Sequence, residues 1–186
     1  MKINPNEFAR SASLSVKKEL SEGIKSFVAV GCRHGTFKTG TRFLEVGHVC
    51  IETDKDPLKE VGCTHYIRFP LIESMLWALG NYAYAIGYRH EFDPESIEDF
   101  QKVMMSGPLK VKLVEDDYGL QAKKYFPCEI ERDGDGFPIF PEEVGDLVIK
   151  AEQWIQKAFD KAREREGNTF KAPSRKDYDP NSTVPF

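Results

Sequence analysis

Basic and aromatic residues alternate along two segments near the N-terminus, in a pattern that suits the binding of a single nucleic-acid strand. Lys25, Phe27 and Arg33 share one face of the segment 24–34, and Tyr66 and Arg68 share one face of the segment 63–69. Aromatic rings on such a face stack on bases and cations contact phosphates, without sequence preference. The alternative is an ordinary sheet face with cross-strand aromatic pairs.

Simple hairpins between these strands would bring further rings and cations onto the same face. Phe27 would lie opposite His48, and His48 opposite Tyr66, so that three rings form a row across three strands. This depends on register, because a slip of one residue moves every side chain to the other face. The contact set predicted from the strands and the loop 35–40 is Lys25, Phe27, Arg33, Phe37, Lys38, Arg42, His48, Tyr66 and Arg68.

Three Cys/His pairs have the spacing that places both members on one face of a strand. They are Cys32 and His34, His48 and Cys50, and Cys63 and His65. The second and third pairs together could bind zinc tetrahedrally, but their spacing is not that of a known zinc finger or ribbon. The favoured registers also put these two pairs on opposite faces. We therefore predict buried free cysteines, no metal site and no cofactor.

The elements that position these residues are indicated by hydrophobic periodicity and by turn residues. Strands are predicted at 24–34, 41–53, 63–69, 109–115 and 120–126, with 128–131 as a possible extension of the last. Leu71–Gly87 is apolar nearly all round and predicts a buried helix, and Asp93 predicts the N-cap of a second helix that ends near Ser106. Apolar residues spaced three and four apart predict an amphipathic helix at Pro141–Arg165.

The order of three strands, helix and two strands is that of the five-stranded OB barrel, although here two helices bridge the third and fourth strands. We expect an α+β, mostly β fold, with an OB-like barrel, bridging helices, a C-terminal amphipathic helix and a flexible tail. The predicted divisions are an N-terminal arm (1–22), the barrel (23–140), the helix (141–166) and the tail (167–186). The apolar stripe of the C-terminal helix must pack on the barrel or against a second copy in a homodimer.

A second basic and aromatic set surrounds the predicted hairpin between the last two strands. In OB folds this hairpin often closes over the ligand. The alternative is a solvated, lysine-bearing edge that discourages aggregation. The residues predicted to contact the ligand here are Lys110, Lys112, Tyr118, Lys123, Lys124 and Tyr125.

The C-terminal residues combine acids with an apolar end: Asp177, Asp179, Val184, Pro185 and Phe186. This end resembles the tip of bacterial and phage single-stranded DNA-binding proteins, an acidic run closed by Ile-Pro-Phe. Asn181-Ser182-Thr183 departs from it, and the preceding segment is basic. The sequences of Leu76–Gly80 and Phe92–Glu95 also look like the corresponding segments of phage-encoded members of this family. The resemblance implies binding of single-stranded DNA in replication, recombination or repair, with the tip recruiting partner enzymes; a chance match is the alternative.

Composition and motifs narrow the function classes. The chain has 186 residues and a net charge of −4, which allows a local basic face but not a chain that is basic throughout. The sequence has no apolar run long enough for a membrane span, and residues 1–10 lack a signal-peptide core, so we expect a cytoplasmic protein, in the host cytoplasm if phage-encoded. No nucleotide-binding, metalloprotease or hydrolase motif occurs, and we predict no catalytic residue. The alternatives are a phage accessory domain that binds only proteins, with or without zinc, and an RNA-binding OB domain.

Overall fold

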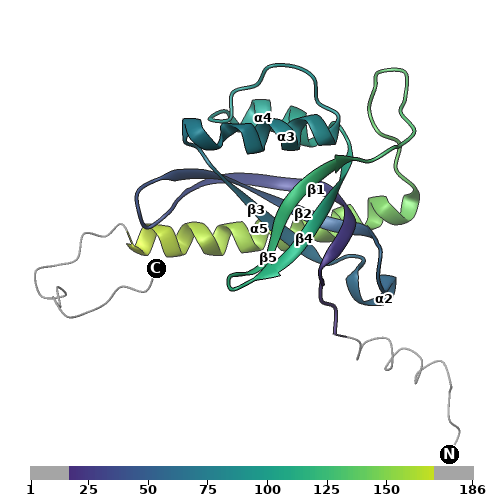
Figure 1. Ribbon diagram of the computed structural model, residues 1–186, viewed down its shortest axis with the longest axis horizontal. Coiled ribbons are helices and arrows are strands. Elements are labelled where there is room, and N and C mark those ends of the chain that lie inside the picture. Colours follow the sequence, from purple (N-terminus) through teal and green to yellow (C-terminus); the bar gives the residue numbers. More distant parts are fainter. Residues whose placement is uncertain (1–16, 170–186) are drawn as a thin grey trace, which may run out of the picture.

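Five antiparallel strands form one sheet in the computed structural model, which describes residues 17–169, with side chains described as far as Glu166 (Figure 1). The strands are β1 (Gly23–Thr36), β2 (Arg42–Thr53), β3 (Thr64–Pro70), β4 (Pro108–Asp116) and β5 (Gly119–Pro127). Their order is β3-β2-β1-β4-β5, so β1 pairs with both β2 and β4. The outer strands do not pair with each other within the described residues, and the sheet is therefore not closed.

Helices cover both faces of this sheet (Figure 1). They are α2 (Pro57–Glu60), the 3-10 turn η1 (Glu73–Met75), α3 (Leu76–Ile86), α4 (Ile97–Met104) and α5 (Glu142–Thr169). One face packs on α3 and α4 around Tyr82 and Phe100, and the other packs on α5 through Ile155 and Phe159. The α+β class and all five predicted strands are confirmed, whereas α2 lies where the sequence predicted only a break.

The two bridging helices differ in detail from the prediction. The N-cap of α4 is Ser96, whose hydroxyl accepts a hydrogen bond from the Asp99 amide, and not Asp93. The Asp93 carboxylate instead accepts from the Glu95 amide in the turn before the helix. The prediction of a buried helix holds only for the side of α3 that packs on the sheet and on α4, because Trp77 and Tyr84 are exposed.

Helix α5 crosses the sheet where both central strands carry glycine. A Cβ on Gly47 would lie 2.7 Å from Ile155 Cγ2, and one on Gly31 would lie 3.4 Å from the same carbon. The two glycines therefore permit a close approach of helix to sheet that any larger residue at Gly47 would obstruct. Ile155 and Phe159 are 1% and 2% exposed, which buries the predicted apolar stripe on the chain's own sheet. Trp154 stays outside this contact, 66% exposed.

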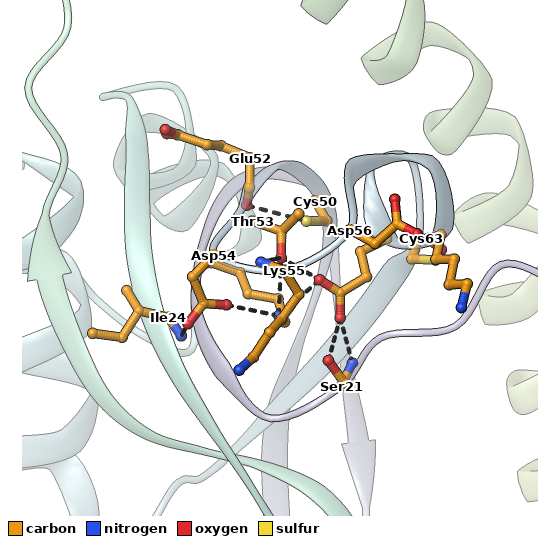
Figure 2. Close-up of polar contacts among 12 residues, drawn as sticks. Ser21, Ile24, Cys50, Glu52, Thr53, Asp54, Lys55, Asp56 and Cys63 are labelled. Carbon is orange, nitrogen blue, oxygen red and sulfur yellow. Dashed lines mark hydrogen bonds and ion pairs between the residues drawn. The ribbon is translucent and has the colours of Figure 1, made fainter.

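A buried ion pair holds β1, β2 and α2 together at one end of the sheet. Lys25 Nζ lies 2.8 Å from Glu60 Oε2 and 3.2 Å from Asp54 Oδ1, and the side chains of Lys25 and Glu60 are 0% and 3% exposed. Ser21 and Thr53 also donate hydrogen bonds to the Glu60 carboxylate. Figure 2 shows both of these donors, with Asp54, among the polar contacts of this cluster. Every charge in this cluster therefore has a partner, as buried charges require.

Candidate nucleic-acid interface

Four residues of the predicted binding face point into the protein. Lys25, Phe27 and Arg33 are 1–2% exposed and His48 is 0% exposed. Lys25 belongs to the ion-pair cluster described above, and Phe27 packs in the core beneath α3 and α4. The prediction that these side chains face outward is wrong, and no ligand reaches them in this arrangement.

The predicted row of three rings is also wrong, because the registers differ. Phe27 pairs with Cys50 rather than His48, and His48 pairs with Ala29 on one side and His65 on the other. Two β-bulges in the β1–β2 ladder shift the register, which alternation alone does not reveal. Tyr66 lies on the opposite face from His48, with its ring 5.9 Å from that of Phe159 in α5.

The ring of His48 is a neutral part of the core, and the neighbouring ring of His65 is half-buried and neutral. His48 Nε2 is hydrogen-bonded to Tyr82 Oη at 2.7 Å. Burial lowers the pKa of His48 to about 3, with a smaller contribution from the charge of His65. Burial likewise lowers the pKa of His65 to about 4. Neither ring carries the charge at neutral pH that a phosphate contact would need.

The loop between β1 and β2 presents part of its predicted set to solvent. Phe37 is half-buried against Phe43, with ring centroids 4.5 Å apart, and Lys38 is exposed. Arg42 is exposed but forms an ion pair with Glu95 at 2.5 Å. Arg68 on β3 is likewise half-exposed, paired with Glu45 and stacked over the Phe43 ring.

A groove of about 1160 Å³ runs between the outer strands β3 and β5 and is bordered by α3 and α5. Three predicted cations line it: Arg68 from β3, and Lys123 and Lys124 from β5. Lys123 forms an ion pair with Asp116 at 3.5 Å. Tyr125 lies at the floor, half-buried against Phe69 and Tyr82, and burial raises the pKa of its hydroxyl well above the usual range.

Two exposed aromatic rings on α3 face this groove, and sequence reasoning did not select them. Trp77 and Tyr84 are 65% and 61% exposed and both line the groove. Their separation of seven residues places them on the same side of the helix. The Arg89 guanidinium lies 3.8 Å from the centroid of the Tyr84 ring. The sequence does hold a signal for these two residues. A helix that is apolar all round and packs on one face of a sheet must leave some of its large side chains exposed to solvent.

Three predicted lysines lie together on the outer face of the β4–β5 hairpin. Lys112 pairs directly with Lys124, and Lys110 pairs with Phe126. Like charges directly opposite each other on neighbouring strands are destabilising. No carboxylate within residues 17–166 lies within ion-pair distance of these three lysines. Tyr118 stands at the tip of the same hairpin, 92% exposed. This face of the hairpin therefore offers three lysines without an ion-pair partner among the described residues next to the groove, while Glu115, Asp116 and Asp117 lie toward the tip.

The Cys/His pairs do not assemble a metal centre in the described part of the chain. Within residues 17–166 no three side chains of His, Cys, Asp or Glu are grouped to hold a metal ion. Cys50 is buried, and burial raises the pKa of its thiol to about 12. Cys63 Sγ instead lies 3.4 Å from the Lys59 carbonyl oxygen.

Comparison with known protein families and with curated proteins finds no match to this chain. Among the described helices none is long and apolar enough to cross a membrane. The predicted partner-binding tail, Asp177, Asp179, Val184, Pro185 and Phe186, lies outside the described residues.

Proposed function

We propose that the protein binds single-stranded DNA, largely without sequence preference, along the groove between β3, β5 and α3 and over the lysine-bearing face of the β4–β5 hairpin. Its activity is binding and not catalysis. The contact residues are Trp77, Tyr84, Arg68, Lys123 and Lys124 in the groove, with Lys110, Lys112 and Tyr118 on the hairpin.

The observation that carries this proposal is the pairing of exposed rings with cations on one groove. Trp77 and Tyr84 are more than half exposed, and they border the same groove as Lys123, Lys124 and Arg68. Aromatic side chains give stacking surfaces for bases, and lysine and arginine follow the phosphates. Only an unpaired strand can turn its bases toward such rings, so the arrangement favours single strands over duplex.

We further propose that the sheet is an open form of the OB-like barrel. Its order is what an OB barrel has when the contact between β3 and β5 is opened, because β1 pairs with both β2 and β4. Phe69 of β3 and Tyr125 of β5 have ring centroids 6.2 Å apart, so the two strands approach each other although they do not pair. The groove would then follow the seam of the barrel.

Binding of a labelled thirty-nucleotide oligo-dT, followed by fluorescence anisotropy at two salt concentrations, tests the proposal. Trp77→Ala and Tyr84→Ala should each weaken binding by roughly 5- to 150-fold, because each stacked base contributes ~1–3 kcal/mol. Trp154→Ala is the matched control, since Trp154 is equally exposed but does not line the groove. Equal affinity of all three folded variants would contradict the proposal. Tighter binding of oligo-rU would favour RNA as the ligand.

Recruitment of replication, recombination or repair enzymes through the C-terminal tip is a separate part of the proposal. It rests on the sequence of Asp177–Phe186. Deleting these residues should leave oligo-dT binding in place and abolish capture of the partner enzymes. Loss of DNA binding in the deletion variant would contradict a recruitment role.

A function limited to protein binding is the second candidate. An apolar hollow of about 660 Å³ lies beside β1, with exposed Met105, Phe137 and Ile149 around it. Apolar surface of this kind can mark a protein contact. Absence of any salt-sensitive oligo-dT binding would favour this candidate over the first.

A further inference from the structure

A buried arginine lies between the sheet and the C-terminal half of α5. Arg33 Nε lies 3.0 Å from Glu45 Oε1, and its Nη1 lies 3.0 Å from Glu166 Oε1 on α5. Its third nitrogen, Nη2, is buried and has no hydrogen-bond partner within the described residues. Glu45 also pairs with Arg68, so two arginines and two carboxylates form one cluster here.

An aromatic side chain of the same helix covers the neighbouring part of the sheet. The Phe159 ring lies 5.9 Å from the Tyr66 ring and 5.7 Å from the Arg33 guanidinium. The Tyr66 hydroxyl is buried beside this ring. Helix α5 thus places the Glu166 carboxylate against the Arg33 guanidinium and the Phe159 ring against the Tyr66 ring. These are the two contacts that a nucleotide makes through its phosphate and base.

We propose that the C-terminal half of α5 covers an extension of the single-strand binding groove, formed by Arg33 and Tyr66 next to Arg68, and that a bound strand displaces this part of the helix. This rests on the proposed function, because the groove described above is lined by Tyr66, Arg68 and Phe159 and so runs directly beneath this part of the helix. A nucleic-acid strand lying in the groove would therefore be kept from Arg33 and Tyr66 by this part of α5.

The charges of the cluster favour such an exchange. While Glu166 is in place, Arg33 and Arg68 are balanced by two carboxylates; once it leaves, the cluster carries one net positive charge. A phosphate in that position offers several acceptor oxygens, so it pairs with Nη1 and also with the unpartnered Nη2. Lifting the helix also exposes the Tyr66 hydroxyl to water.

The first half of α5 is held more firmly than the second. Ile155 sits directly over Gly47 and Gly31, where the approach of helix to sheet is closest, and Ala151 is buried beside it. Beyond Phe159, the described contact of the helix with the sheet is mainly the Arg33–Glu166 ion pair, and the Glu166 side chain is 29% exposed. The displaced part therefore begins at Phe159, whose ring has to leave its contacts with Tyr66 and Arg33 together with Glu166.

Oligo-dT affinity of Glu166→Gln, compared with Glu164→Gln, tests this exchange. Both variants remove one negative charge from α5, but Glu164 is exposed and only Glu166 contacts Arg33. Glu166→Gln should bind oligo-dT roughly 2- to 5-fold more tightly than wild type, the scale of a partly exposed ion pair. Glu164→Gln should match wild type to within the experimental error.

Hydrogen exchange of the wild-type protein gives an independent readout. Oligo-dT should reduce amide protection of residues 159–166 while leaving that of residues 147–153 unchanged. Equal affinity of the two variants, or protection at 159–166 that is unchanged or increased, would overturn the covered site and leave the groove assignment standing. If wild type binds no oligo-dT in either salt condition, the proposed function and this inference both fail.

Discussion

Replacing Glu60 by glutamine should show whether the buried cluster around Lys25 is structural. Glutamine keeps the size of the side chain and removes its charge, so Lys25 retains only the partly exposed Asp54 as an ionic partner. Removing one partner of a buried ion pair is costly because the other charge stays buried. The substitution therefore separates a stability role for Lys25 from the DNA contact that the sequence suggested.

The size of the effect follows from the pKa of Glu60. Burial alone would raise this pKa, but hydrogen bonds from Lys25, Ser21 and Thr53 outweigh it and lower the pKa from 4.5 to about 2. A pKa lowered from 4.5 to about 2 corresponds to a stabilisation of ~3 kcal/mol. Because the folded-state pKa is the lower one, this stabilisation is complete above pH 4.5 and is lost as the pH falls toward 2.

Urea unfolding at several pH values provides the assay. At pH 7 Glu60→Gln should lower the free energy of unfolding by ~3 kcal/mol, and the difference from wild type should shrink as the pH approaches 2. Glu91→Gln, at an exposed position, is the control and should change stability by less than ~0.5 kcal/mol. Lys25→Met combined with Glu60→Leu should recover most of the loss, since apolar side chains can replace a buried pair. A loss for Glu60→Gln that is small, or that does not depend on pH, would refute this reasoning.

Three further outcomes follow from the described contacts. Lys112→Gln and Lys124→Gln should each reduce the log-salt slope of oligo-dT binding by ~0.7. Lys102→Gln on α4 should leave this slope unchanged. Equal slopes in all three variants would show that the DNA does not contact the hairpin. Phe27→Ala should cost ~3–5 kcal/mol in urea unfolding, whereas Tyr118→Ala at the exposed hairpin tip should cost almost nothing; a stable Phe27→Ala protein would contradict its place in the core. Because burial lowers the pKa of His65 from 6.5 to about 4, stability should fall as the pH drops from 6.5 toward 4. His65→Asn should reduce the steepness of this fall, and the remainder belongs to His48, whose pKa is lowered to about 3; a fall as steep as that of wild type would show that His65 does not contribute.

Local patterning was enough to place the strands and their hairpin neighbours, but not to set the register between them. Period-two alternation between glycine, proline and aspartate clusters located all five strands, and Asp116-Asp117-Tyr118-Gly119 gave the β4–β5 turn correctly. The bulges near Phe27 and Gly31 are set by packing across the sheet, and no local signal marks them. Each displaced the face assignment of the residues beyond it.

Buried charge was the main cause of error at the candidate site. Lys25 and Arg33 looked like solvent-facing cations because their partners Glu60 and Glu45 are distant in sequence. The hairpin lysines were placed correctly outward because the alternation of β4 is regular and its apolar residues face the core. The sequence placed Trp77 and Tyr84 in a helix predicted to be buried. The residues of a helix do not by themselves show how many of its sides other elements will cover.

Tryptophan fluorescence tests the groove most directly, because the chain has two tryptophans, and only Trp77 lines the groove. In Trp154→Phe the emission comes from Trp77 alone, and in Trp77→Phe it comes from Trp154 alone. Titration with oligo-dT at low salt should quench the first protein strongly through base stacking and leave the second nearly unchanged. Anisotropy of the labelled oligonucleotide, recorded in parallel, establishes that both proteins reach saturation. Unquenched Trp77 emission at saturation would contradict the placement of the strand in this groove.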